Sequence, residues 1–420
     1  MSEPDASAEP AGPTAPKRRG RVKKKHTVGK VLLGVSLALA LVTGLGVAFL
    51  YRHLNGNLSE LDVTAQLENR PDKKEVEGPK EPLNVLVMGS DTRDGAGNNI
   101  DNLTGGGARS DTTILLHVSA DRKRAYGVSI PRDSLVTRPD CKTKGGETIP
   151  GGTDVMWNDA FSVGGPACTI QQFEQITGVY IDHFVVVDFA GFEDMVDAID
   201  GVEVCIPEDI TDPAHGINIP AGTREVRGRE ALNYVRARYT LGDGSDIGRI
   251  SRQQAFIASM VNKVKSANVL ARPDRLVRFL EAATKSLTVD KNLSSIAKIA
   301  DLALQFQDTG LDKIQFITVP WEYDQRPEYR GRVSWLPQAD EVWRKLAADE
   351  PLTKRLTSDA INAARPPGSE APSGSGGESP SGSESSPSDG GTGGTGGNGG
   401  NGGESDGPSG EEALNLGLCA

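Results

Sequence analysis

An uncharged stretch from Val31 to Tyr51 restricts this chain more than any other feature of its sequence. A helix needs about 20 apolar residues to cross the hydrocarbon core of a bilayer, and this stretch has that length. The alternative is a core helix buried in a soluble protein, but an apolar run of that kind is usually shorter. Residues 28–51 are therefore predicted to form one transmembrane helix, which leaves all later residues on one side of a membrane.

The charges that flank this stretch predict its orientation. The residues before it are rich in lysine and arginine, whereas the whole chain of 420 residues has a formal charge of −11. Basic flanks stay in the cytoplasm, so residues 1–27 are predicted to be a cytoplasmic stub and the later chain to be extracytoplasmic. A cleaved signal peptide is the alternative, although its apolar region usually has about 7–15 residues. A basic arm could also bind nucleic acid, but the acidic chain lacks the basic surface that a nucleic-acid partner requires.

Composition divides the rest of the chain into three parts. Residues 52–82 are polar and are predicted to be an extracytoplasmic stalk. Residues 83–356 contain the apolar runs of a compact domain. Residues 357–420 are rich in glycine, serine and proline, and such a segment buries too little apolar area to offset the entropy lost on ordering. We expect this tail to be disordered.

Strand and helix patterns alternate within the compact part. Short apolar runs rich in branched residues predict strands, and apolar residues at helical spacing predict helices. The expected strands are 83–88, 112–118, 125–130, 183–187, 202–206 and 314–319. The expected helices are 169–176, 191–199, 229–238, 247–267, 273–286, 294–307 and 338–347. This order favours an α/β fold in which helices cover both faces of one central sheet.

The four cysteines all lie on the predicted outer side, where disulfides persist. No Cys-x-x-Cys pair is present, so a metal site built on cysteine is not expected. Cys141 and Cys168 flank one loop region and form the expected disulfide. Cys205 lies in a strand-like run and is expected to be a small buried apolar residue. Spacing alone leaves the other pairings, including those with Cys419, open.

Aspartates and an arginine stand at the ends of three predicted strands. Asp91 follows the strand 83–88, Asp111 precedes the strand 112–118, and Arg132 follows the strand 125–130. If the first two strands pair antiparallel, Asp91 and Asp111 meet at one edge of the sheet. Two neighbouring carboxylates share a proton or a cation. Mg²⁺ binds one or two carboxylates together with phosphate oxygens.

A cluster of arginines follows in the helical part of the domain. Arg236 and Arg238 converge only near a helix end, whereas Arg249 and Arg252 share a helix face. The planar guanidinium group binds phosphate oxygens through two hydrogen bonds. Any single arginine is more often a solvated surface charge. The arginines taken together with Arg132 and the aspartates favour a site for a polyanion.

In their order and joint presence, these motifs resemble those of the LytR-CpsA-Psr family of cell-wall glycopolymer transferases. The resemblance covers about residues 83–350. The matching segments are Gly89–Arg93, Arg109–Thr112, Ser129–Asp133, Asn158–Phe161 with Gly164 and Gly165, Asp182–Phe189, Ala231–Arg238 and Gly248–Gln254.

The resemblance implies a twisted mixed sheet with an apolar groove for a polyprenyl tail, lined by the helices after Ile247. It implies transfer of a glycopolymer from a polyprenyl-pyrophosphate carrier to peptidoglycan through a new phosphodiester. By that likeness Asp91 and Asp111 hold Mg²⁺, and either of them is the candidate base. The implied catalytic residues are Asp91, Asp111 and Arg132. The implied phosphate-binding residues are Arg93, Arg109, Arg132, Arg236, Arg238, Arg249 and Arg252.

Two inserts depart from the pattern of the family, a glycine-rich one at residues 94–108 and a loop at residues 139–153 that carries Cys141. Neither removes a motif residue. Two other functions remain open from the sequence: a polyprenyl-pyrophosphate phosphatase, and a non-catalytic membrane-attached regulator that binds the lipid carrier. A pure binding protein needs the arginines but not Asp91 and Asp111, and the sequence does not identify the glycopolymer.

Overall fold

The structure is a computed structural model, and it forms two parts, residues 1–52 and residues 53–420. The first part contains most of helix α1 (Thr27–Asn57), which is long and apolar enough to cross a membrane. This helix matches the predicted apolar segment and continues six residues beyond Tyr51. The described residues are 27–76, 78–90, 110–213, 216–237, 246–266, 272–306, 308–368, 413, 414, 416, 418 and 419.

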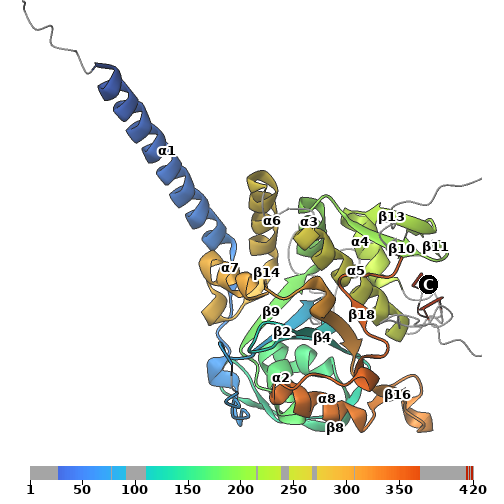
Figure 1. The fold of residues 1–420 in the computed structure, drawn as a ribbon. Helices are drawn as coiled ribbons and strands as arrows, with labels where there is room; N and C mark the ends of the chain where they lie inside the picture. Colours follow the sequence, from blue (N-terminus) through green and yellow to red (C-terminus); the bar gives the residue numbers. More distant parts are fainter. Residues whose placement is uncertain are drawn as a thin grey trace, which may run out of the picture. The chain divides into compact units, whose positions relative to one another are not determined.

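The second part is built on one mixed sheet of eight strands (Figure 1). In spatial order the strands are β1 (Ser59–Glu60), β14 (Leu287–Val289), β9 (His183–Asp188), β2 (Leu83–Ser90), β3 (Ser110–Val118), β4 (Ala125–Ile130), β15 (Ile314–Thr318) and β18 (Ile361–Asn362). The pairs β1–β14, β2–β9 and β4–β15 are parallel, and the other neighbours are antiparallel.

The register of the central strands brings several strand ends to one edge. β2 and β3 pair antiparallel from Leu83↔Val118 to Ser90↔Ser110, which is the arrangement that the sequence analysis considered for these two strands. Because β4, β9 and β15 run in the same direction as β2, the carboxyl ends of all four strands meet at the start of β3. We call this the carboxyl edge. Ligands of open α/β sheets bind at such an edge.

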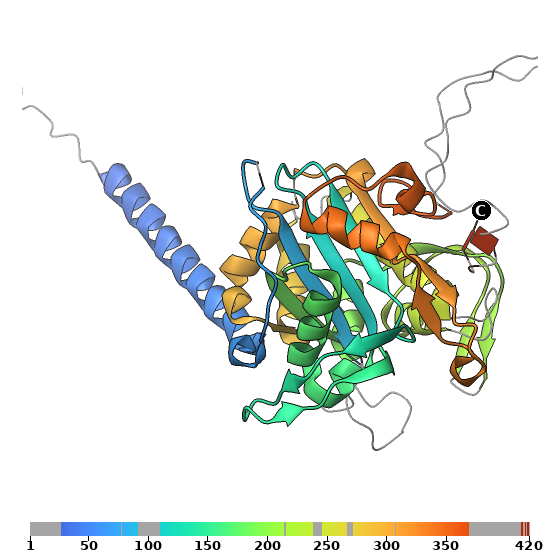
Figure 2. The same ribbon diagram turned by 90° about the horizontal axis from the view of Figure 1, so that it is seen from below.

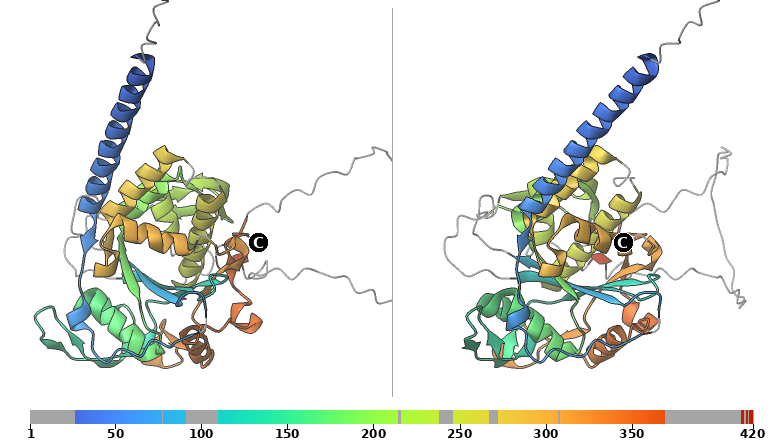
Figure 3. Two further views of the ribbon diagram at one scale, coloured as in Figure 1. Left: turned by 60° about the vertical axis from the view of Figure 1, so that its left-hand side comes forward. Right: turned by 90° about the vertical axis from the view of Figure 1, so that its left-hand side faces the viewer.

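Helices cover both faces of the sheet, which confirms the expected fold class. Leu86, Met88 and Leu115 are buried on the face that packs against α2 (Asp159–Thr177) and α8 (Gln338–Ala347) (Figure 2). The other face carries α3, α4, α5, α6 and α7, and Figure 3 shows the two layers on opposite sides. These helices are α3 (Phe189–Ala198), α4 (Gly228–Arg236), α5 (Asp246–Ser266), α6 (Pro273–Ser286) and α7 (Ile296–Gln305).

Short hairpins and turns connect these layers. The paired strands are β5 (Leu135–Arg138) with β8 (Gly152–Met156), β6 (Cys141–Lys142) with β7 (Thr148–Ile149), β10 (Val202–Ile206) with β13 (Gly222–Val226), β11 (Ile210–Asp212) with β12 (Ile217–Ile219), and β16 (Trp321–Tyr323) with β17 (Val333–Trp335). The 3-10 helices are η1 (Thr64–Gln66), η3 (Lys291–Leu293), η4 (Leu311–Lys313), η5 (Pro327–Tyr329) and η6 (Lys354–Thr357).

The folded domain extends beyond both of its expected boundaries. The expected stalk contributes β1 to the sheet, buries Val63, and holds Arg70 in an ion pair with Glu174 of α2. Past the expected end at residue 356, β18 pairs with β15. Short edge strands have few apolar residues and pair with sequences far away, so composition does not reveal them.

The cysteines form two disulfides. Cys141–Cys168 confirms the expected pair. Cys205 is not a free apolar residue as expected, because it is bonded to Cys419 at a sequence separation of 214 residues. Ala413 and Leu418 are buried in the same core cluster as Ala255 and Ala258 of α5, so residues near the C-terminus pack on the domain. Residues 369–412 of the expected disordered tail lie outside the described residues.

Candidate active site at the carboxyl edge

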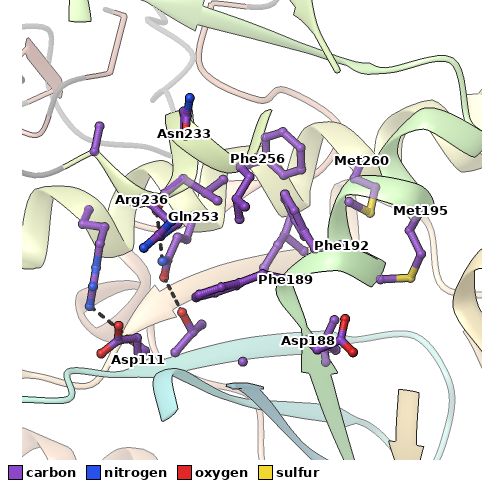
Figure 4. A pocket seen from close by; sticks show the side chains of 18 of the residues that line it. Asp111, Asp188, Phe189, Phe192, Met195, Asn233, Arg236, Gln253, Phe256 and Met260 are labelled. Atoms are coloured by element: carbon purple, nitrogen blue, oxygen red, sulfur yellow. Dashed lines mark hydrogen bonds between the residues drawn. The ribbon is translucent and has the colours of Figure 1, made fainter. Parts of the chain in front are cut away.

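A cavity of about 730 Å³ lies between the sheet and helices α3, α4 and α5 (Figure 4). Most of its wall is apolar, and its volume is in the range of ligand sites, about 300–1,000 Å³. The apolar lining comes from Val87, Ile114, Leu116, Val187, Phe189, Phe192, Met195, Ile217, Leu232, Val235, Phe256, Ile257 and Met260. The cavity is therefore suited to a long apolar group.

Charged side chains line one end of this cavity. Asp111 comes from the start of β3, Arg236 from the last turn of α4, and Arg249 from the first turn of α5. Figure 4 shows Asp111 and Arg236 on one side of the pocket, with Met195 and Met260 on the other. We call the Asp111 side the polar end. The cavity thus joins a mostly apolar interior to a cluster of charged side chains at the carboxyl edge, and Asp188, Asp212 and Arg229 also line it.

Two arginines and two carboxylates form one network at the polar end. Arg132 Nη1 is 2.6 Å from Asp111 Oδ1, and its Nε is 3.3 Å from Asp246 Oδ1. Arg249 Nη2 is 2.7 Å from the same Asp246 oxygen and donates a hydrogen bond to the carbonyl oxygen of Asp111 at 3.1 Å. The network therefore links β3, the loop after β4 and the start of α5.

The charges of this network stabilise one another. Burial alone would lower the pKa of Arg132, but the carboxylates of Asp246 and Asp111 outweigh it and raise that pKa above its ordinary value. Within the described residues, Arg132 Nε and Asp246 Oδ1 are buried without a hydrogen bond of good geometry, although they form an ion pair at 3.3 Å. Asp246 Oδ2 is buried there without a hydrogen-bond partner.

Two glutamines of α5 hold the helix over the sheet. Gln253 Nε2 donates to the carbonyl of Val235 at 3.2 Å, and its Oε1 accepts from Thr112 Oγ1 at 3.1 Å. Gln254 Nε2 donates to Ser129 Oγ at 2.9 Å. The guanidinium of Arg236 stacks over the ring of Phe189 at 4.8 Å. These contacts fix the positions of α4 and α5, the helices that carry Arg236 and Arg249.

The structure brings Asp111, Arg132, Arg236 and Arg249 to this end of the fold. Arg252 differs from its expected role, because it is fully buried and is not among the cavity residues. Its guanidinium donates to the carbonyls of Ala237 and Leu416. Three residues turn a helix by about 300°, so the two side chains differ in direction by about 60°: Arg249 reaches Asp111, whereas Arg252 reaches Ala237 and the C-terminal residues. The other predicted site residues, Asp91, Arg93, Arg109 and Arg238, lie outside the described residues.

Sequence reasoning gave no role to Asp246 or to the α3 wall. Asp246 is the first residue of α5 and stands three positions before Arg249, a spacing that predicts an ion pair on a helix. Of the helices after Ile247, α5 lines the cavity with Phe256, Ile257 and Met260. The opposite wall of the cavity comes from α3. In the sequence, nothing distinguishes the aromatic residues of this helix from residues of an ordinary hydrophobic core.

The oxygen donors at the polar end have the chemistry that a hard divalent cation prefers. Within the described ranges, no group of three or more His, Cys, Asp or Glu residues is arranged to hold a metal ion. Asp111 supplies one carboxylate on the cavity wall. One or two carboxylates with phosphate oxygens are enough for Mg²⁺, so the residues present fit that ion together with a phosphorylated ligand.

Comparisons with known proteins agree with this geometry. The profile of the LytR_cpsA_psr family matches residues 50–347. The cell wall biosynthesis protein LcpA of Corynebacterium glutamicum is 32% identical over 264 residues, which are 56% of this chain and 49% of LcpA. This chain therefore spans about half the length of that relative. The polyisoprenyl-teichoic acid–peptidoglycan teichoic acid transferase TagU of Enterococcus faecalis is 30% identical over 291 residues, which are 68% of this chain and 88% of TagU.

A solved structure shares the fold. The LytR-Csp2A-Psr enzyme from Actinomyces oris superposes with a TM-score of 0.50 at 19% identity, over 70% of this chain and 96% of that one. The family profile begins at residue 50, which agrees with a domain that includes β1. On these grounds the chain belongs to the LytR_cpsA_psr family.

Proposed function

We propose that this chain is a membrane-anchored phosphotransferase that moves a glycopolymer from a polyprenyl-pyrophosphate carrier to a hydroxyl group of peptidoglycan. The observation that carries the proposal is one cavity with an apolar interior and a charged end at the carboxyl edge. A polyprenyl pyrophosphate has the same two parts, a long apolar chain and a polyanionic head. The transferase activity named for TagU supports the same reading.

The apolar interior binds the polyprenyl chain. Aromatic and methionine side chains of α3 and α5 line the cavity, among them Met260, and the rings of Phe192 and Phe256 pack together with centres 5.3 Å apart. Methionine and aromatic residues adapt to irregular apolar chains. The hydrophobic effect then positions the lipid so that its pyrophosphate reaches Asp111 and Arg249.

The charged end carries the reaction. The hydroxyl oxygen of the acceptor sugar attacks the phosphorus that bears the glycopolymer, and a new P–O bond forms. The bond from this phosphorus to the bridging oxygen breaks, and polyprenyl phosphate leaves with that oxygen. The hydroxyl proton passes to a carboxylate, for which Asp91 and Asp111 are the candidates. Arg132, Arg236 and Arg249 stabilise the charge that develops on the phosphoryl oxygens.

Mg²⁺ is the cofactor that we propose for this site, with Asp111 and Asp91 as the protein residues that would hold it. The bound ion would neutralise part of the charge of the pyrophosphate. Asp111 serves this role from a fixed position, because Arg132 pairs with its carboxylate at 2.6 Å. The arginines of the network remain in place to orient the phosphate groups.

The membrane topology follows from the same proposal. Helix α1 anchors the chain, and the basic residues before it keep the N-terminus in the cytoplasm. The domain then lies outside the cytoplasm, where the peptidoglycan acceptor is found. Two disulfides within this domain fit an oxidising compartment.

A turnover assay with the full chain in detergent tests the proposal. The full chain is required because residues outside 83–356 complete the sheet. We would follow release of polyprenyl phosphate from a pyrophosphate-linked oligosaccharide, with and without Mg²⁺ and soluble peptidoglycan fragments. Asp111→Asn is expected to lower turnover by about a hundredfold or more, the size of effect seen when one charge-stabilising group is lost. Asp312→Asn, at an exposed carboxylate before β15, is the matched control and should not change it.

The products separate the possible functions. A phosphodiester between the oligosaccharide and the peptidoglycan fragment supports the transferase. Release of polyprenyl phosphate with water as the only acceptor would instead assign a phosphatase. Tight binding of the lipid without turnover in the wild-type chain would overturn the enzymatic proposal in favour of a binding protein.

A further inference from the structure

We infer that the β16–β17 hairpin is a binding platform for the sugar rings of the acceptor glycan strand. This inference rests on the proposed function, because it assigns the surface from which the acceptor hydroxyl reaches the phosphate. The hairpin is not part of the cavity. Its position, its exposed aromatic rings and its attachment to the Arg132 loop carry the argument.

The hairpin starts at the carboxyl edge beside Arg132. β15 runs parallel to β4, with Thr318 paired to Ser129. Val319 N then donates to the carbonyl of Ser129 at 3.0 Å, and Trp321 begins the hairpin two residues later. Arg132 likewise lies two residues after Ile130, the last residue of β4. The two segments therefore leave neighbouring parallel strands at the same edge.

Three contacts fasten the hairpin to the Arg132 loop. Arg332 forms an ion pair with Asp133, which directly follows Arg132. Val333 N donates to the carbonyl of Asp133 at 3.2 Å. Trp335 Nε1 donates to Ser134 Oγ at 3.0 Å. A ligand on the hairpin is thus held at a fixed position relative to the arginine that pairs with Asp111.

The hairpin presents aromatic rings to solvent. Trp321 and Tyr323 pack edge to face with ring centres 5.1 Å apart, and Tyr323 is 44% exposed. A network at the tip holds the hairpin: Asp324 pairs with Arg326 at 2.8 Å, and Arg326 also reaches Asp154 of β8 at 2.9 Å. Rings on a braced hairpin bind without first being ordered, which lowers the entropic cost of binding.

This surface has the chemistry that recognises a pyranose. A sugar ring has an apolar face of C–H groups, which packs on an aromatic ring, and a rim of hydroxyls, which bonds to polar side chains. Tyr323 supplies the ring, and Arg326, exposed at the tip of the hairpin, supplies guanidinium donors. A charged side chain near the ring favours a sugar, which carries hydroxyl groups, over a purely apolar ligand.

The geometry of phosphoryl transfer indicates that the sugar bound at the hairpin belongs to the acceptor and not to the donor. The attacking and leaving oxygens lie roughly in line across the phosphorus. The lipid leaves into the cavity on the α3–α5 face of the sheet. Trp335 of the hairpin packs with the core of the opposite face, where its ring lies 5.6 Å from that of Trp343 of α8. The attacking hydroxyl therefore arrives from the hairpin side.

A binding titration with the full chain in detergent tests the platform. The probes are peptidoglycan fragments released by a muramidase, an N-acetylglucosamine tetrasaccharide, and the water-soluble head of the donor without its lipid. Tyr323→Ala is expected to weaken binding of the peptidoglycan fragments about tenfold, the size of one lost ring contact. Tyr323→Phe keeps the ring and should restore the affinity. Leu304→Ala, at an exposed apolar residue of α7, is the control and should bind as the wild type does.

The outcomes separate this inference from the proposed function. Equal affinity of wild type and Tyr323→Ala for the fragments would overturn the platform, even if the chain turns over its donor. Tighter binding of the donor head than of the fragments, with the same dependence on Tyr323, would also overturn it. Loss of fragment binding in Tyr323→Ala by a chain that shows no turnover would support the platform and contradict only the proposed transferase.

Discussion

At the residue scale, Asp246 organises the polar end of the cavity. Its Oδ1 atom lies within 3.3 Å of Arg132 and 2.7 Å of Arg249, so one carboxylate orients two guanidinium groups. A long arginine side chain has many rotamers. The carboxylate of Asp246 restricts the rotamers of both arginines because it pairs with each of them. Asp246 thus positions the guanidinium groups of Arg132 and Arg249, in contrast to Arg252, which holds main-chain carbonyls inside the protein.

Replacing Asp246 with asparagine tests this role. Asp246→Asn keeps the size of the side chain but removes its charge, so Arg132 and Arg249 lose the anion that orients them. We expect turnover of the pyrophosphate donor to fall about ten- to a hundredfold, as for other groups that orient residues at a site. Steady-state kinetics should show a lower kcat, and Asp246→Glu should restore part of it.

The control for this change is Asp274→Asn. Asp274 also lies in the first turn of a helix and pairs with Arg278, but it is exposed on α6. Exposed ion pairs contribute little, so this variant should match the wild type in kcat. Equal kinetics of Asp246→Asn and wild type would show that the arginines need no such support.

At the scale of elements, α3 is held against α6 by a glycine. A Cβ atom on Gly191 would lie 1.7 Å from the Cβ of Ser286, which is closer than any real contact. The two helices therefore approach each other through the hydrogen atom of Gly191. Because α3 also carries Phe189, Phe192 and Met195 of the cavity wall, this contact sets the position of that wall.

The variant Gly191→Ala should separate the two helices. We expect it to lower the free energy of unfolding by about 1–3 kcal/mol, because an extra methyl group in a packed contact forces the backbone to shift. Denaturant unfolding measures this change, and Ser286→Gly in the same chain should restore part of it. Gly145→Ala, in an exposed turn where the added Cβ meets only ordinary contacts, should change the stability little. Wild-type stability in Gly191→Ala would show that α3 and α6 are free to move apart.

At the scale of the whole molecule, the Cys205–Cys419 disulfide closes the domain. It joins β10 to the C-terminal residues across 214 positions, and Leu416 beside it accepts a hydrogen bond from Arg252. A cross-link over so long a loop removes many conformations from the unfolded chain. It also fixes the buried Leu418 against the core that includes α5.

We expect Cys205→Ala to lower the free energy of unfolding by about 2–5 kcal/mol, the usual effect of removing a native disulfide. The unfolding of the oxidised protein, followed by circular dichroism, measures this. Because both residues act through one bond, Cys205→Ala combined with Cys419→Ala should be no less stable than Cys205→Ala alone. A double variant that is far less stable than either single one would mean that the two cysteines stabilise the fold separately.

The sequence by itself determined the features that depend on local spacing. The apolar run at Val31–Tyr51 predicted helix α1, and the periodicity of apolar residues predicted the central strands and most helices within a few residues, although α2 begins ten residues before its expected start. The resemblance to the family, carried by motifs spread along the chain, implied one site for residues that include Asp111, Arg132, Arg236 and Arg249. The apolar patterns lie within short windows of the chain, where hydrophobic periodicity acts directly.

Only the tertiary structure decided the features that join distant segments. β1 and β18 complete the sheet, Cys205 bonds to Cys419, and Asp246 pairs with Arg132. Arg252 shares the motif of Arg249 but turns inward, because its helix packs there against Ala237 and the C-terminal residues. These contacts form between residues separated by tens to hundreds of positions, and their free energy depends on packing that no short pattern encodes.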